Sequence, residues 1–109
     1  MASNIINIKY QNIVRDLVEK MRSDNRVLNV FFIDHTIGSC KINLYYVNSQ
    51  LITMKDLFCI TIEPELSVVH DNFFLKVSES DLFTKNIIIS DKSYEILIEY
   101  IKYIKDYYI

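Results

Sequence analysis

The stretch DHTIGSC, residues 34–40, places several potentially reactive side chains close together. Asp34, His35 and Cys40 surround Gly38, the single glycine of the chain. A cysteine beside a histidine base can act as a nucleophile if the thiolate is stabilised and a third group orients the imidazole. The alternative is a hairpin loop over TIGS, in which Gly38 supplies a positive φ angle. Asp34 and His35 are neighbours and point to opposite faces of an extended chain, so we favour the turn and predict no catalytic residue.

Residues of the kinds that bind zinc are spread widely along the chain. They follow the pattern H-x4-C-x18-C-x10-H and are His35, Cys40, Cys59 and His70. Zinc sites usually take their ligands in close pairs such as C-x2-C, because one tight turn presents both. No such pair occurs here, and one glycine is too few for the phosphate loops and dinucleotide fingerprints of many enzymes. The sequence therefore predicts no metal site, no cofactor and no enzymatic activity.

Two groups of acidic residues give only weak evidence for acid–base chemistry. Glu63 and Glu65 flank Pro64, and we expect both at the edge of a sheet, facing the same way. The sequence HDN, residues 70–72, sets a histidine beside an aspartate, but its residue types are typical of a turn. A general base also needs a substrate pocket, for which the sequence offers no sign. We interpret both groups as solvated surface.

Length and composition indicate one folded domain over residues 1–109. Half of the residues are hydrophobic, which is enough for a core of its own. The formal net charge is -2, and no cluster of Lys or Arg offers a basic surface for phosphates. We therefore expect no nucleic acid among the partners.

The chain is expected to work in the cytoplasm, without a membrane partner. Its first ten residues lack the basic start and apolar run of a signal peptide, and no apolar run approaches the roughly eighteen residues of a membrane span. Two cysteines are too few for a disulfide scaffold, so free thiols are expected. Codon supply also bears on origin: abundant Ile, Asn, Lys and Tyr with a single Gly and Pro indicate an AT-rich gene, as in many viruses and mobile elements.

Two segments show the spacing of amphipathic helices. Over residues 4–23 the apolar side chains recur every three or four positions, with charged residues on the opposite side. Over residues 90–109 the pattern is helical again, and Ser90 or Asp91 can cap the start. These two segments predict an N-terminal and a C-terminal helix.

The middle of the chain reads as four or five strands. A dense apolar run at 26–35 suggests a strand buried on both faces, and residues 40–48 alternate as in a half-buried strand. Further strands are expected at 57–65, ended by Pro64, at 72–80 and, more briefly, at 86–90. The connections are short and polar, with turns expected at 47–50 and 70–72 and a longer loop or helical turn at 78–83. We predict an α+β fold, a two-layer sandwich of two helices on one antiparallel sheet.

The C-terminal helix carries more apolar surface than one packed face needs. At about 100° per residue, one stripe is expected in the core, and a second stripe lies beside it. Tyrosine buries a large apolar area while its hydroxyl stays hydrated, and aromatic residues are enriched at protein interfaces. We predict that the second stripe binds a partner or a second copy of the chain, and that Tyr45, on the polar side of its strand, is also exposed. The first stripe is Tyr94, Leu97, Ile101, Ile104 and Tyr108, and the second is Ile96, Tyr100, Tyr103 and Tyr107.

These features favour a small protein-binding antagonist without chemistry of its own. Compact acidic α+β proteins of AT-rich elements often cover the working surface of a target, as toxin-immunity and anti-defence proteins do. The carboxylates of Glu63, Glu65, Asp71 and Glu79 could imitate phosphate charge for a nuclease target, although a net charge of -2 makes a poor mimic. The alternative hypothesis is a homodimeric structural or chaperone-like module, joined through the C-terminal helix.

Overall fold

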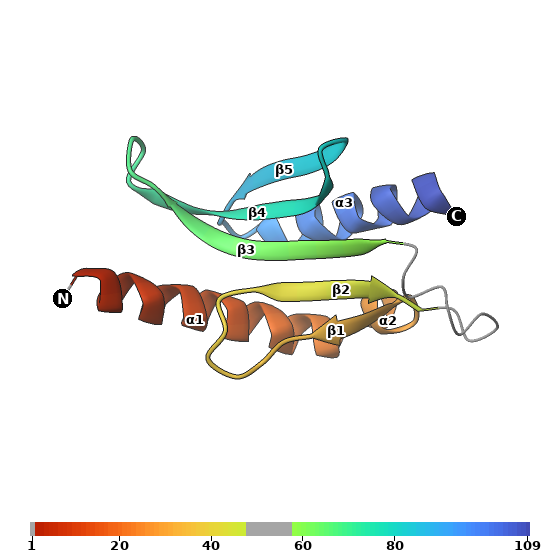
Figure 1. The fold of residues 1–109 in the computed structure, drawn as a ribbon, viewed down its shortest axis with the longest axis horizontal. Helices are drawn as coiled ribbons and strands as arrows, with labels where there is room; N and C mark the ends of the chain where they lie inside the picture. Colours follow the sequence, from red (N-terminus) through yellow and green to blue (C-terminus); the bar gives the residue numbers. More distant parts are fainter. Residues whose placement is uncertain (1, 48–57) are drawn as a thin grey trace.

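A computed structural model describes residues 2–47 and 58–109 and shows an α+β arrangement of helices and one sheet (Figure 1). The N-terminal helix, the antiparallel sheet and the C-terminal helix predicted from the sequence are all present. In chain order the elements are α1 (Ala2–Arg22), α2 (Asn25–Leu28), β1 (Phe31–Asp34), β2 (Ile42–Tyr46), β3 (Cys59–Ser67), β4 (Asn72–Ser80), β5 (Phe83–Ile88) and α3 (Ser93–Tyr108).

The sheet is an antiparallel meander in which every strand pairs with its neighbours in sequence. Its order is β1-β2-β3-β4-β5, so β1 and β5 form the two edges. The β1–β2 loop contains Gly38 at φ 88°, and the turn before β4 contains Asp71 at φ 48°. The predictions of antiparallel pairing, of the TIGS loop and of the turn at 70–72 are confirmed. The expected turn at 47–50 falls largely outside the described residues.

One face of the sheet is buried and the other is open. Side chains alternate along every strand, and the register brings the buried ones to a single face, against both helices. In the view of Figure 1 the helices lie behind the sheet, so the open face is toward the reader. The inward side chains are Phe31, Ile33, Ile42, Leu44, Tyr46, Ile60, Ile62, Leu75, Val77, Phe83 and Ile87.

Each long helix adds one apolar face to this core. The spacing of three and four residues along α1 buries Val14, Leu17, Val18 and Met21. The corresponding face of α3 buries Leu97, Ile98, Ile101 and Ile104, and three of these four belong to the first stripe predicted from the sequence. Among the described residues, no helix is long and apolar enough to cross a membrane.

The prediction of one strand over 26–35, buried on both faces, is wrong. The segment begins with α2, because the Asp24 carboxylate accepts a hydrogen bond from the Arg26 backbone N–H (2.9 Å) and caps a helical turn. Only β1 is extended, and its residues alternate between buried and exposed. Phe32, on the open face, is 60% exposed.

Two strand boundaries also differ from the expectation. β3 continues through Pro64 to Ser67, because β2 begins opposite Ile62 and leaves one side of β3 without a partner strand at Pro64. A missing N–H on that side breaks no ladder bond. The segment 78–83 is a tight hairpin turn and not a longer loop, so that β5 starts at Phe83.

Candidate functional site

The potentially reactive residues of the β1–β2 loop are held apart. The Nε2 atom of His35 lies 3.3 Å from the Ser39 carbonyl oxygen. The Cys40 thiol lies toward α1, where its Sγ is 3.7 Å from the Asn7 side-chain oxygen. The two side chains therefore have separate polar contacts, as expected for residues that flank a hairpin loop.

The second cysteine lies on the open face of the sheet in an unreactive setting. Cys59 pairs in register with Tyr45 of β2, and burial raises the pKa of its thiol, which disfavours the nucleophilic thiolate. Both cysteines are free. Within 2–47 and 58–109, no group of three or more His, Cys, Asp or Glu side chains is placed to hold a metal ion.

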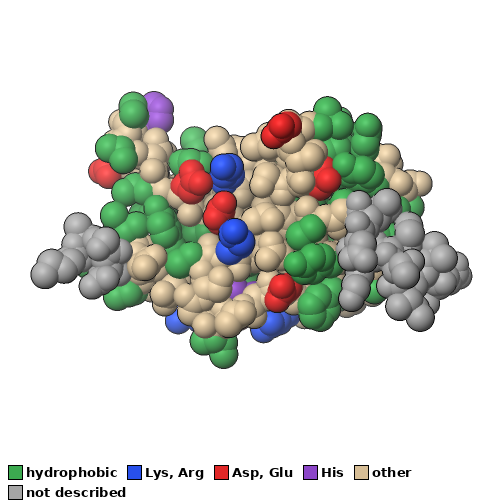
Figure 2. Space-filling model, viewed as in Figure 1, with side chains coloured by type: hydrophobic (Ala, Val, Ile, Leu, Met, Phe, Trp, Pro, Cys, Tyr) green, Lys and Arg blue, Asp and Glu red, His purple; other side chains and the backbone are tan. Residues whose placement is uncertain are grey.

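The acidic residues named as phosphate mimics do not form one cluster. Glu63 and Glu65 face the same way, as predicted, on the open face of β3, in the part of this strand that pairs with β4 but lies beyond the end of its pairing with β2. Glu63 stands opposite Lys76, which balances its charge. The Glu79 carboxylate instead accepts a hydrogen bond from the Tyr108 hydroxyl (2.9 Å), and Asp71 lies in the turn before β4. Figure 2 shows acidic and basic side chains alternating across the middle of the open face.

The most distinctive surface is formed where α3 lies beside the edge strand β5. We call this surface the aromatic edge. Hydrophobic side chains gather at this end of the molecule in Figure 2, at the upper right of the view. The aromatic edge consists of Ile96, Tyr100, Tyr103 and Tyr107 of α3 with Phe83 and Lys85 of β5.

A buried phenylalanine supports two exposed tyrosines of this surface. The Phe83 side chain is 4% exposed, and its ring centroid lies 5.8 Å from that of Tyr103 and 4.9 Å from that of Tyr107, both edge to face. Tyr103 and Tyr107 are each 61% exposed. Their rings are thus fixed at one side and open to a partner at the other, the arrangement that aromatic anchors of interfaces require.

The rest of the aromatic edge contains a shallow hollow with balanced charges. The hollow has a volume of about 310 Å³, and Lys85 and Glu99 bring opposite charges to its lining. The Lys85 ammonium lies 5.3 Å from the centre of the Tyr100 ring, a cation–π contact, and Tyr100 stacks on Tyr103. The lining residues are Lys85, Ile96, Glu99, Tyr100 and Tyr103.

The five residues predicted to bind a partner are not all brought together. The four from α3 share the aromatic edge, whereas Tyr45 lies on the open face of β2, next to Cys59. Sequence reasoning missed Phe83 and Lys85 because it predicts a loop or helical turn at 78–83 and begins the last strand at residue 86. The sequence FTKNII has no clear apolar–polar alternation, so it gives no strong local signal for these two residues.

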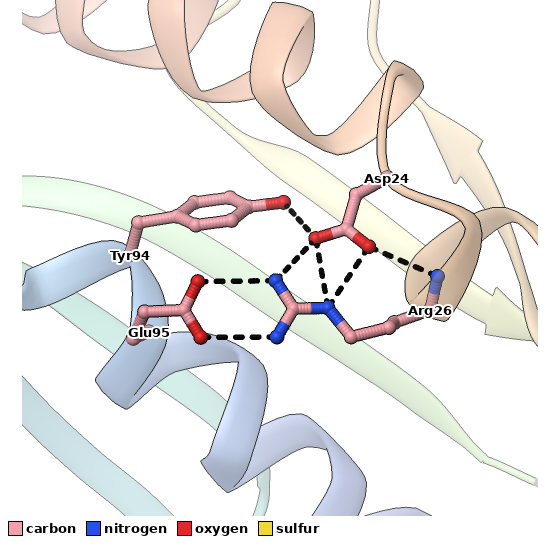
Figure 3. A network of polar contacts seen from close by, with 4 residues as sticks. All are labelled: Asp24, Arg26, Tyr94 and Glu95. Atoms are coloured by element: carbon pink, nitrogen blue, oxygen red, sulfur yellow. Dashed lines mark hydrogen bonds and ion pairs between the residues drawn. The ribbon is translucent and has the colours of Figure 1, made fainter.

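A polar cluster fixes the start of α3 against the α1–α2 corner (Figure 3). The Arg26 guanidinium donates to both oxygens of Asp24 and to both oxygens of Glu95, at 2.8–3.2 Å. The Tyr94 hydroxyl donates to Asp24 Oδ2 at 2.8 Å. Because Tyr94 and Glu95 lie in the first turn of α3, the cluster ties this end of the helix to the α1–α2 corner.

The electrostatics of the cluster follow from these contacts. The hydrogen bonds from Arg26 hold the pKa of Asp24 at about 2, below its ordinary value of 3.8, although burial opposes this change. The same guanidinium lowers the pKa of Glu95. Burial, followed by the hydrogen bond to Asp24, raises the pKa of the Tyr94 hydroxyl, which stays protonated and donates.

The free energy of unfolding should therefore fall in acid, because the Asp24 carboxylate becomes protonated. A carboxylate whose pKa is lowered on folding stabilises the fold above its unfolded-state pKa of 3.8, and this contribution is lost as the pH falls toward 2. Asp24→Ala should cost about 2 kcal/mol at pH 7, since it removes a helix cap and leaves the Tyr94 hydroxyl without its acceptor. Urea unfolding of both proteins between pH 7 and pH 2 measures the difference.

Asp16 offers a matched control for this prediction. Its carboxylate makes only an exposed contact with Arg15 (3.8 Å), so Asp16→Ala should change the free energy of unfolding by less than about 0.5 kcal/mol. An equal acid dependence in the wild type and in Asp24→Ala would contradict the role assigned to the cluster.

Comparisons of the chain with protein-family models, curated proteins and solved structures give no match.

Proposed function

We propose that this chain is a non-enzymatic antagonist, which binds a protein partner through the aromatic edge and neutralises it by covering its working surface. The observation that carries the proposal is the pair Tyr103 and Tyr107, each 61% exposed and both supported by the buried Phe83 ring. Interface energy is concentrated in such rigid aromatic anchors, because they bury a large area and lose little conformational entropy on binding.

The chemistry of the remaining surface supports a role in binding rather than catalysis. His35 and Cys40 contact different groups, and burial makes the Cys59 thiol less acidic. On the open face of the sheet, Glu63 stands opposite Lys76, so these two charges offset each other. These observations favour a protein surface as the target, such as that of a toxin or a host factor, over a nucleic acid.

A homodimeric structural or chaperone-like module is the second candidate. The observation in its favour is the position of β5, which forms an edge of the sheet directly beside the tyrosines of α3. A module of this kind would present its client with the joined open faces of two sheets.

Site-specific photocrosslinking tests the antagonist proposal. A benzoylphenylalanine in place of Tyr103 should crosslink to one partner protein in the cells that naturally produce the chain. The purified partner should then bind in a defined stoichiometry and lose its activity. The double variant Tyr103→Glu, Tyr107→Glu should weaken binding by at least about a hundredfold. This is the effect expected from the loss of a single hot-spot residue, so it is a lower limit for two.

Ile37 provides the control position, because it is 97% exposed in the β1–β2 loop, at the opposite edge of the sheet. Benzoylphenylalanine at Ile37 should give no crosslink to the same protein. A partner that crosslinks from Ile37, or that binds the double variant as tightly as the wild type, would contradict the proposal.

A further inference from the structure

The outer edge of β5 has unpaired backbone groups. In the β4–β5 ladder the Ile89 N–H donates to the Phe73 carbonyl oxygen at 3.1 Å. Backbone groups of an antiparallel strand alternate between its two sides, so the N–H and C=O groups of Thr84, Asn86 and Ile88 point away from β4. Among the described residues, no strand pairs with this side of β5.

The ladder with β4 is irregular at Ser78/Ser80, beside the start of β5, but the rest of β5 has few of the usual devices that protect an edge strand. Natural edges are blunted by outward lysines, prolines, bulges or a covering segment. The sequence of β5 is FTKNII, and its one lysine, Lys85, is directed over the Tyr100 ring on the helix side. The side chain of Ile88 is exposed on the open face. An edge whose outward residues Thr84, Asn86 and Ile88 carry no charge is therefore available for pairing.

The β5 edge is complementary to itself. Two antiparallel copies related by a two-fold axis at Asn86 place Thr84 of one copy opposite Ile88 of the other, and each Asn86 opposite its counterpart. All three pairs exchange backbone hydrogen bonds. None of these residues is charged, and the adjacent hollow is lined by residues of both signs, Lys85 and Glu99. The three backbone pairs thus form without like-charge repulsion between their own side chains.

The size of the face fits a weak dimer that dissociates on dilution. The six residues of β5 extend over about 20 Å, and the sheet with its helix layer is about 15–20 Å deep. A face of these dimensions covers about 300–400 Å², up to about half of the roughly 800 Å² per partner that stable interfaces bury. Because α3 lies beside β5 in both copies, the two-fold axis brings Ile96, Tyr100 and Tyr103 of the two chains toward one another.

We propose that a second copy of this chain covers the aromatic edge, through antiparallel pairing of β5 with β5 and packing of the α3 tyrosines around a two-fold axis. The dimer is one sheet of ten strands, five from each copy, with all helices on the same face. The inference rests on the proposed function in taking the aromatic edge as a protein-binding surface. It adds a regulation of that surface, since a partner must displace the second copy to reach it.

Light scattering after size-exclusion chromatography of the full chain tests the inference. The wild type should have the mass of two chains and should dissociate on dilution. Tyr103→Glu and Asn86→Pro should each raise the dissociation constant of the dimer by at least a hundredfold, with an unchanged circular dichroism spectrum. Asn86→Pro removes an N–H that points away from β4 and pairs with no strand among the described residues, and proline is tolerated at such edge positions. Ile37→Glu, at the far edge of the sheet, should remain a dimer.

Asn86→Asp is a second variant, in case proline disturbs the fold. It places two carboxylates opposite each other at the two-fold axis, so the dimer should dissociate at pH 7 and recover in mild acid. A wild type that is monomeric at every concentration would overturn the inference, as would a dimer that tolerates both Tyr103→Glu and Asn86→Asp. If such a monomer still crosslinks a partner from position 103, the proposed function stands and only the self-pairing is lost.

Discussion

Replacing Phe83 by alanine is expected to lower the free energy of unfolding by about 3 kcal/mol and to abolish binding through the aromatic edge. The Phe83 side chain is 4% exposed and contacts three tyrosine rings of α3, with centroid distances of 4.9–6.1 Å. Truncation of a buried phenylalanine typically costs 3–5 kcal/mol. We expect the low end of this range because Tyr103 and Tyr107 are exposed on their outer sides, so that solvent can reach part of the space that the phenylalanine leaves.

Urea unfolding and light scattering together test this prediction. The stability loss shows that Phe83 belongs to the core, and the loss of association shows that it also holds the tyrosines in place. Leu82→Ala, one residue earlier in the exposed turn, is the control and should change stability by less than about 0.5 kcal/mol. A Phe83→Ala variant that is destabilised but associates as tightly as the wild type would contradict its supporting role.

Replacing Ile62 by alanine should cost about 4 kcal/mol, a large part of the 5–15 kcal/mol that stabilises an ordinary domain. Ile62 is 0% exposed and lies in the central strand, between Ile42 of β2 and Val77 of β4. Both helices cover this face, so the cavity has no solvent into which it can open. Urea unfolding measures the loss of stability. If the variant is too unstable to show a folded baseline, the absence of a cooperative transition shows the effect.

The neighbouring residue tests the one-sided burial of the sheet. Glu63 points to the open face opposite Lys76, and Glu63→Gln should change the free energy of unfolding by less than about 0.5 kcal/mol. Comparable losses for Ile62→Ala and Glu63→Gln would mean that both faces of β3 are covered, contrary to the architecture described above.

The helices and the inward faces of the strands were predictable because local periodicity specifies them, whereas the order of the strands was not. The steps of three and four residues in α3 identified Leu97, Ile101 and Ile104 as core, and all three are buried. The alternation of Ile42, Leu44 and Tyr46 likewise identified the inward face of β2. In these segments burial on one side is the dominant energy, and the pattern of apolar residues records it directly.

The misassigned segments are those in which a single polar contact or a strand end decides the conformation. The apolar content of 26–35 suggested a strand, but the Asp24 carboxylate caps α2 at its start. Pro64 suggested a strand end, but it lies beyond the start of β2, where its missing N–H breaks no ladder bond. Propensity describes the average environment of a residue and does not register such local exceptions.

The candidate site was predictable in part. Helical geometry placed Ile96, Tyr100, Tyr103 and Tyr107 on one side of α3, but it could not show that Phe83 lies beneath two of them. The hydrogen bond from Tyr94 to Asp24 joins residues 70 positions apart, and no local pattern indicates it. Strand alternation assigned Tyr45 to an outward face, but whether that face adjoins the aromatic edge depends on the tertiary arrangement.

The most direct test of a second copy of the chain as the cover of the aromatic edge is amide hydrogen exchange along β5, measured by NMR at several protein concentrations. The N–H groups of Thr84, Asn86 and Ile88 point outward and have no partner within the described residues, so in an isolated chain they should exchange almost as fast as in an unfolded peptide. At high protein concentration, we expect the exchange of these three amides to slow to nearly the rate of Lys85 and Ile87. Dilution should restore their rapid exchange. Rapid exchange of these three amides at every concentration, beside protected inward neighbours, would contradict the proposed dimer.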